Sequence, residues 1–247
     1  SDPTNCGSCG NVCVSTICNA GVCAIRCNTA AARVLIYGPG GTLSQPHFPA
    51  GTVVTVASEA TWRSMTTADF GQYDIIWIDG ANCASGSAHL TAARDTQAVW
   101  GAATTGRVVL TSMDADFHAA GTAEARQYIA NSVNWLKQMG RTANSGKTSL
   151  YLAFGCTLVT SPTIYPSNFP TALGTPFGAI DATNCPAGMS RTAAGLTHSV
   201  MSGVSSFNWS CIPHGQFVTW PSSFSNLAGT PSATRSACLA RNDVCVP

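Results

Sequence analysis

Three residues near the middle of the chain carry side chains suited to acid–base chemistry. Asp114, Asp116 and His118 alternate directly after the apolar run at 107–111. On an extended backbone, alternating side chains point the same way, so these three would converge on a metal ion or a water molecule. The alternative interpretation is structural: one of the two aspartates caps a turn, and His118 packs beneath it.

Further candidates for a nucleophile or a base lie in the same turn and later in the chain. Ser112 follows the apolar run directly and offers a hydroxyl in the same turn. His198 and His214 are candidate general bases that would pair with Ser112 or Asp114. A structural alternative is open for both histidines as loop residues that bond to the backbone.

The twelve cysteines carry a different chemistry. Six of them lie between Cys6 and Cys27, in a segment too short to hold itself together by burying apolar surface. Disulfides are favoured over zinc, since zinc sites usually separate their ligand pairs by longer loops and often use histidine, and the first histidine is His47. The other six are also even in number, so we predict that all are paired and that the chain holds no metal and no cofactor. The predicted disulfide residues are Cys6, Cys9, Cys13, Cys18, Cys23, Cys27, Cys83, Cys156, Cys185, Cys211, Cys238 and Cys245.

The overall composition limits the partners of the protein. Charged residues make up 9% of the chain, against about 25% in an average soluble domain, and the net charge is +1. The sequence has no basic stripe for phosphates, so nucleic acid is not expected as a partner. No apolar stretch approaches the ~20 residues that span a membrane. A surface so poor in charge lacks the repulsion that keeps copies apart, which favours a homo-oligomer or polymer.

Short apolar runs at regular intervals predict the elements that position these residues. They show no clean alternation of polar and apolar positions, which is typical of parallel strands covered on both faces. Helical patterns at 89–100 and 122–139 lie between the later runs. We therefore predict an α/β fold with a mostly parallel, flavodoxin-like sheet flanked by helices. The predicted strands lie at 34–37, 52–57, 74–79, 107–111 and 149–154.

The ends of the chain differ from this middle part. Residues 1–28 form the predicted disulfide-rich module, and an α/β domain covers 33–247 with a loop-rich, disulfide-pinned extension from about 157. The extension holds a glycosylation sequon at Asn208. An aromatic cluster in the same region suggests a carbohydrate-binding face, although such clusters more often belong to a core. Its members are Phe207, Trp209, Phe217 and Trp220.

Two segments resemble known families. The sequence CGSCGNVC followed by CNAGVC resembles the cysteine-rich modules of stigma-specific-type secreted proteins, which implies a disulfide-bonded extracellular module. Residues 33–156 resemble the class I glutamine amidotransferase-like, flavodoxin-type fold and its ThuA-like relatives, through the segments YDIIWIDG and GRVVLTSMDADFH. Catalytic members of that family carry a cysteine nucleophile in the turn after the fourth strand. Here that turn reads Thr-Ser-Met-Asp over 111–114, so the resemblance implies the scaffold without its nucleophile.

These observations predict a secreted, disulfide-stabilised protein, extracellular or at the cell surface, that is structural or adhesive and not catalytic. Self-association into a surface assembly is its expected partner interaction. The alternatives are a secreted hydrolase that uses the Asp/His site at 114–118 or His214, and a carbohydrate-binding protein.

Overall fold

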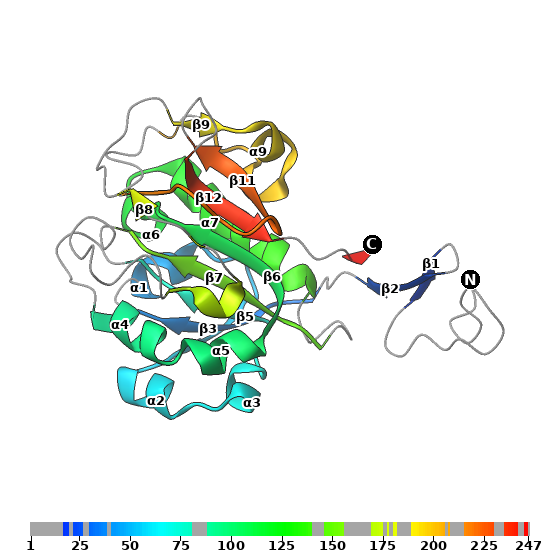
Figure 1. Ribbon diagram of the computed structural model, residues 1–247, viewed down its shortest axis with the longest axis vertical. Coiled ribbons are helices and arrows are strands. Elements are labelled where there is room, and N and C mark those ends of the chain that lie inside the picture. The colour runs from blue at the N-terminus through cyan, green and yellow to red at the C-terminus, as the bar shows by residue number, and fades with distance from the viewer. Residues whose placement is uncertain are drawn as a thin grey trace.

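The structure is a computed structural model in which one large sheet dominates the α/β domain (Figure 1). Ten strands form this sheet, in the order β4-β3-β5-β7-β6-β12-β10-β8, with β11 and β9 joined beside β12. The structure describes residues 17–19, 22–26, 30–38, 41–80, 88–139, 146–155, 169–174, 177, 180–181, 189–205, 207, 215–229, 235–241 and 245–246.

Five parallel strands form the half of the sheet that the sequence predicts. They are β3 (Arg33–Tyr37), β4 (Val53–Val56), β5 (Ile75–Ile78), β6 (Thr104–Thr111) and β7 (Thr148–Ala153). All but the edge strand β4 are almost wholly buried, because helices cover both faces. The mostly parallel α/β sheet is therefore confirmed.

The strand order differs from the predicted flavodoxin-like one. In that arrangement the fourth strand in sequence lies beside the third and the fifth is outermost. Here β7, the fifth, lies between β5 and β6 and pairs in parallel with both. The helix that follows β6 therefore returns the chain inward, toward the middle of the sheet.

The C-terminal region contains more regular structure than the predicted loop-rich extension. β11 (Phe224–Gly229) and β12 (Ser236–Arg241) form an antiparallel pair, and β12 also pairs antiparallel with β6. The short strand β10 (Gln216–Phe217) also pairs antiparallel with β12. Two further short strands complete this half of the sheet: β8 (Ile180–Asp181) and β9 (Ser190–Arg191).

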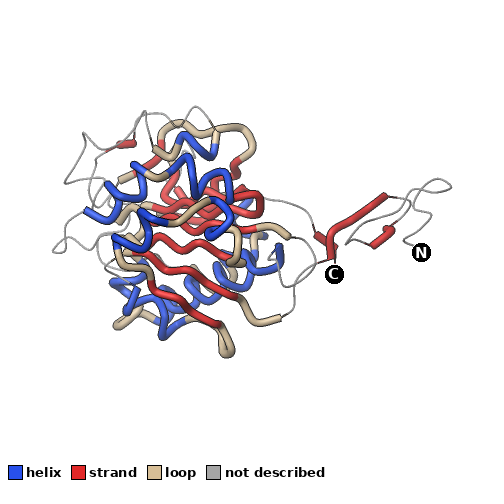
Figure 2. The backbone as a smooth tube through the Cα atoms, turned by 90° about the horizontal axis from the view of Figure 1, so that it is seen from below, coloured by secondary structure: helices blue, strands red, loops and turns tan. Residues whose placement is uncertain are grey.

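Helices cover the two faces of the sheet and enclose a core on each side (Figure 2). On one face, α6 (Ala115–His118), α7 (Ala123–Leu136) and η5 (Ser199–Met201) pack against β3, β5 and β7. The other face is covered by a second group of helices. This group is α2 (Glu59–Ser64), α3 (Thr67–Phe70), α4 (Ala88–Asp95), α5 (Gln97–Ala103) and η4 (Thr171–Leu173).

The two predicted helices are present with altered bounds. The helix predicted over 89–100 is divided at Thr96 into α4 and α5, and the one over 122–139 is α7 followed by η2 (Lys137–Met139). The irregular connection after β3 holds two short helical turns, α1 (Gly41–Ser44) and η1 (Gln45–His47). A small helix, α9 (Ala193–Thr197), packs against β11. None of the helices in the described ranges is long and apolar enough to cross a membrane.

A small separate sheet contains the first described residues and the last. β1 (Ile17–Asn19) pairs antiparallel with β2 (Val22–Arg26), and β13 (Cys245–Val246) pairs in parallel with β2. The backbone register places Cys18 opposite Cys23. In Figure 1 this sheet stands apart from the large sheet, on the side where the parallel strands begin.

Candidate functional site

The carboxyl ends of the parallel strands hold a cluster of buried polar side chains. The chain runs from β3 outward to β4 and then across β3 to β5, so the strand order reverses between β3 and β5. Ligands of open α/β sheets bind at such a reversal point, beyond the ends of the strands. Asp79 follows β5 directly at this point, and α6 follows the end of β6 nearby.

Asp79 is the central residue of the cluster and is completely buried. Its Oδ1 accepts hydrogen bonds from Ser44 Oγ at 2.7 Å and from Trp77 Nε1 at 2.6 Å. Its other oxygen, Oδ2, is also buried and has no hydrogen-bond partner among the residues that the structure describes. Burial raises the pKa of Asp79 to about 7, although the bonds from Ser44 and Trp77 act to lower it. Asp79 therefore exchanges a proton near neutral pH.

His89 fixes the backbone next to this carboxyl. Its Nε2 lies 3.0 Å from the carbonyl oxygen of Asp79. Burial lowers the pKa of His89 to about 4, so the ring is neutral and donates this bond. Gly38, with φ of +131°, lies against both residues: a Cβ there would meet the His89 ring at 3.1 Å and Asp79 Cβ at 3.2 Å. Only glycine fits this close approach.

Asp114 and His118 meet, but not for the reason that the sequence suggested. The backbone from Ala115 is a helical turn and not an extended strand, so side chains four residues apart come together. His118 Nε2 lies 3.2 Å from Asp114 Oδ1. Asp114 occupies the N-cap position of α6, but its side chain makes no capping hydrogen bond.

Asp116 interacts electrostatically with both Asp79 and Asp114. Its side chain is buried, and burial raises its pKa well above the ordinary value. The negative charges of Asp79 and then Asp114 raise the pKa further, while backbone N–H groups of Phe117 and Asp116 lower it. Three aspartates therefore share one low-dielectric region, and they cannot all be ionised at neutral pH without a large cost.

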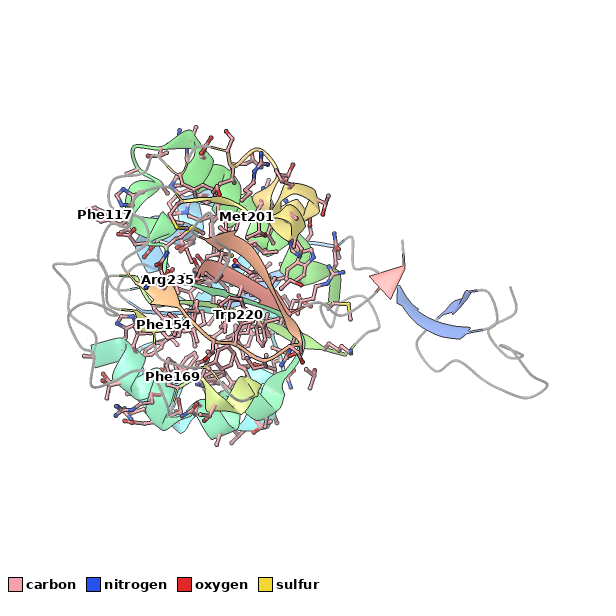
Figure 3. All side chains as sticks on the ribbon, turned by 45° about the horizontal axis from the view of Figure 1, so that its top comes forward. Phe117, Phe154, Phe169, Met201, Trp220 and Arg235 are labelled. Atoms are coloured by element: carbon pink, nitrogen blue, oxygen red, sulfur yellow. The ribbon has the colours of Figure 1, made fainter. Side chains whose placement is uncertain are left out.

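Solvent reaches the cluster on the α6 side. The side chain of His118 is 12% exposed, whereas that of Asp114 is almost fully buried. Phe117 is 51% exposed at the surface beside it (Figure 3), and its ring lies 5.2 Å from that of His118. His118 is therefore the partly exposed member of this pair.

Ser112, the candidate nucleophile, lies in a closed turn. Its side chain is completely buried, and its Oγ donates to the carbonyl oxygen of Ala237 on β12 at 3.4 Å. The backbone N–H of Ser112 donates to the same carbonyl at 3.0 Å, and Thr111 Oγ1 at 3.1 Å. An attacking hydroxyl must be exposed and bonded to a base, so Ser112 does not fit that role.

The other predicted site residues are dispersed or lie outside the described residues. His198 packs edge-on against Trp135 and accepts a hydrogen bond from the backbone of Val200, which assigns it a structural role. His214, Asn208 and Trp209 lie outside the described ranges. Phe207 and Phe217 are buried in the cores on opposite faces of the sheet, so these two side chains do not share one aromatic face.

One predicted disulfide is corrected by the structure. Cys238 on β12 is a free, buried thiol, and its Sγ lies 3.4 Å from the hydroxyl of Tyr128. Burial raises the pKa of this thiol to about 12. The side chains of the other eleven predicted disulfide residues are not described. Cys18, Cys23 and Cys245 lie in strands, and the rest are outside the described ranges: Cys6, Cys9, Cys13, Cys27, Cys83, Cys156, Cys185 and Cys211.

The cluster does not resemble a metal centre. Within the described part of the chain, no three His, Cys, Asp or Glu side chains are arranged to hold a metal ion.

No protein-family model, no curated protein and no solved structure matches the chain.

Sequence reasoning missed three members of the cluster. Asp79 ends a predicted strand, Ser44 lies in an irregular stretch rich in Gly and Pro, and His89 begins a predicted helix. A signal was present for Asp79 alone. It ends an apolar run at the carboxyl edge of a parallel sheet, where functional side chains gather.

Proposed function

We propose that the protein is a secreted, disulfide-stabilised structural or adhesive protein that self-associates in a surface assembly and does not carry out acyl transfer. The closed turn after β6 carries this proposal. Ser112 is completely buried, and its N–H and Oγ both bond to Ala237. An amidotransferase-like scaffold needs an exposed nucleophile at this turn, and β12 covers the position.

The composition supports the remaining part of the proposal. Twelve cysteines favour an oxidising, extracellular location. Charged residues make up 9% of the chain and the net charge is +1, so electrostatic repulsion between copies is weak. Such a surface favours dense packing of many copies.

Sedimentation velocity of the oxidised protein tests this proposal. We expect the weight-average sedimentation coefficient to rise with protein concentration, and the native protein to be recovered with cell-surface material. A monomer at every concentration, together with absence from that material, would refute the proposed function.

A secreted hydrolase is the second candidate, favoured by the 3.2 Å contact between His118 and Asp114 beside two carboxyls of raised pKa. In such an enzyme, His118 would take a proton from the attacking water, and Asp114 would stabilise the resulting imidazolium. Asp116, whose pKa is raised well above its ordinary value by burial, would donate a proton to the leaving group. This division of roles follows from the different surroundings of the carboxyls.

Hydrolysis assays with ester, amide and glycoside substrates test the second candidate. The variants His118→Asn and Asp116→Asn should abolish any hydrolysis, while Asp95→Asn, at an exposed aspartate on α4, should leave it unchanged. That pattern would replace the structural proposal with the hydrolase. Hydrolysis that survives both cluster variants would eliminate this site as its origin.

A further inference from the structure

The strand β4 forms one edge of the large sheet. Among the strands that the structure describes, it has only β3 as a neighbour. The N–H of Val53 donates to Ala32 at 2.8 Å, and that of Ala57 donates to Ile36 at 2.8 Å. In a parallel ladder, successive residues direct their backbone groups to opposite sides. The N–H and C=O groups of Val54 and Val56 therefore face outward from the sheet.

This edge lacks the usual protection against pairing with another strand. Proteins protect edges with lysine, other charges, proline or bulges. The segment 44–58 contains no Asp, Glu, Lys or Arg, and no proline occurs between 50 and 57. The side chains of Val53 and Val56 are 59% and 56% exposed. A partner strand would therefore meet an extended and uncharged segment with outward-facing backbone groups and exposed valine side chains.

We infer that β4 pairs with β4 of a second copy of this chain, in an antiparallel arrangement about a two-fold axis at Thr55; the inference rests on the proposed self-association. In this register Val54 of one copy lies opposite Val56 of the other. Each of the two equivalent pairs exchanges two backbone hydrogen bonds, because these residues direct their N–H and C=O groups outward. The two copies of Thr55 face each other between the pairs.

Several features favour a second copy over another partner. The edge is self-complementary, since a two-fold axis brings the same uncharged segment against itself. No like charges meet across the axis, because the segment 44–58 has none. Val54 and Val56 lie on one face of the sheet, opposite Val34 and Ile36 of β3, so β-branched side chains would pair across the new contact. The two sheets would then become one continuous sheet.

The size of the contact predicts its strength. Stable interfaces bury about 1,200–2,000 Å² in total, and two strands as short as β4 bury less than this. The association should therefore be weak and depend on concentration. It would become effective in a dense surface assembly, where many copies are held close together.

A charge-swap experiment tests the inference. Thr55→Lys or Thr55→Glu places like charges opposite each other at the axis, and each variant alone should weaken dimerisation by up to about fivefold. An equimolar mixture of the two should dimerise again, because opposite charges then meet. Thr197→Lys, the same substitution at an exposed site on α9, is the matched control and should dimerise like the wild type.

Hydrogen exchange gives a second, independent measurement. The amides of Val54 and Val56 should become protected as the concentration of the wild-type protein rises. If the wild type self-associates but Thr55→Lys does so equally well, the edge pairing is wrong and the proposed assembly uses another surface. If the wild type stays monomeric, the pairing is refuted; the proposed function is refuted as well when the native protein is also absent from cell-surface material.

Discussion

The buried Asp79 carboxyl should make the protein less stable as the pH rises toward neutrality. Burial raises the pKa of Asp79 from 3.8 to about 7, so the folded state holds a proton that the unfolded chain releases in this range. Stability falls with pH wherever the folded state binds more protons than the unfolded state. The stabilisation that this proton gives the folded state is fully present below the pKa of Asp79 in the unfolded chain, and it is lost as the pH rises to about 7. The rise in pKa corresponds to about 4 kcal/mol of unfolding free energy.

The variant Asp79→Asn removes this titration while keeping the shape of the side chain. The amide oxygen of asparagine can still accept the hydrogen bonds from Ser44 and Trp77. Its NH₂ group takes the place of Oδ2, which has no hydrogen-bond partner among the described residues, and a buried group left unsatisfied costs about 1–3 kcal/mol. The variant should therefore be less stable than the wild type near pH 4 and more stable near pH 7.

Urea unfolding of both proteins across this pH range, with disulfides intact, measures the difference. We expect the two stability curves to cross between pH 4 and 7, with a flatter curve for the variant. Asp95→Asn, at an exposed aspartate whose pKa is lowered by Arg94 and Arg63, serves as the control: it should be less stable than the wild type at pH 7, the gap should narrow as the pH falls, and the two curves should not cross. A constant difference between Asp79→Asn and the wild type at every pH would refute the reasoning, because Asp79 would then be ionised in the folded state.

Two further predictions concern the core. Burial and a pKa of about 12 should make Cys238 inert to iodoacetamide in the folded protein, and peptide mapping should find it labelled after unfolding without reductant. With Cys238 unpaired, an odd number of cysteines remains, so a second labelled thiol or a bond to a cysteine outside this sequence is expected. Thr96→Val removes the acceptor of the buried Trp62 Nε1 at 2.8 Å and should lower the unfolding free energy by about 1–3 kcal/mol in the same urea assay; Thr197→Val, at an exposed threonine, should cost less than a third of that.

The central strands could be predicted because their sequences report burial directly. Val34 to Tyr37 and Ile75 to Ile78 are unbroken apolar runs, and covering both faces of a strand requires such a run. The order of the strands could not be predicted in this way. No local sequence pattern indicates that β7 lies between β5 and β6, because that position depends on how the helices pack.

The hairpin of β11 and β12 was missed for a physical reason. Its sequences, FSNLAG and SACLAR, are rich in small residues with weak preference for strands. Pairing with β6 holds β12 in place, with Leu239 opposite Leu110. Tertiary contacts therefore decide this element, and the prediction of a loop-rich extension used only local information.

The even cysteine count failed in a similar way at Cys238. An even number of cysteines predicts pairing only when each cysteine can reach a partner. Cys238 is on β12, where its side chain is buried beside Tyr128.

The candidate site was predicted in part. Asp114 and His118 were identified, but their contact comes from a helical turn and not from an extended backbone.

The cluster at the carboxyl edge also separates the two candidate functions. The chain has eleven acidic residues, and three of them lie buried together at Asp79, Asp114 and Asp116. Active sites retain such groups although they reduce stability, whereas a structural clasp gains nothing from a carboxyl that resists ionisation. If Asp79→Asn is more stable at neutral pH and also loses a hydrolytic activity, the cluster is an active site. If the variant is more stable and assembles normally, the aspartates serve only to join α1, β5 and α6.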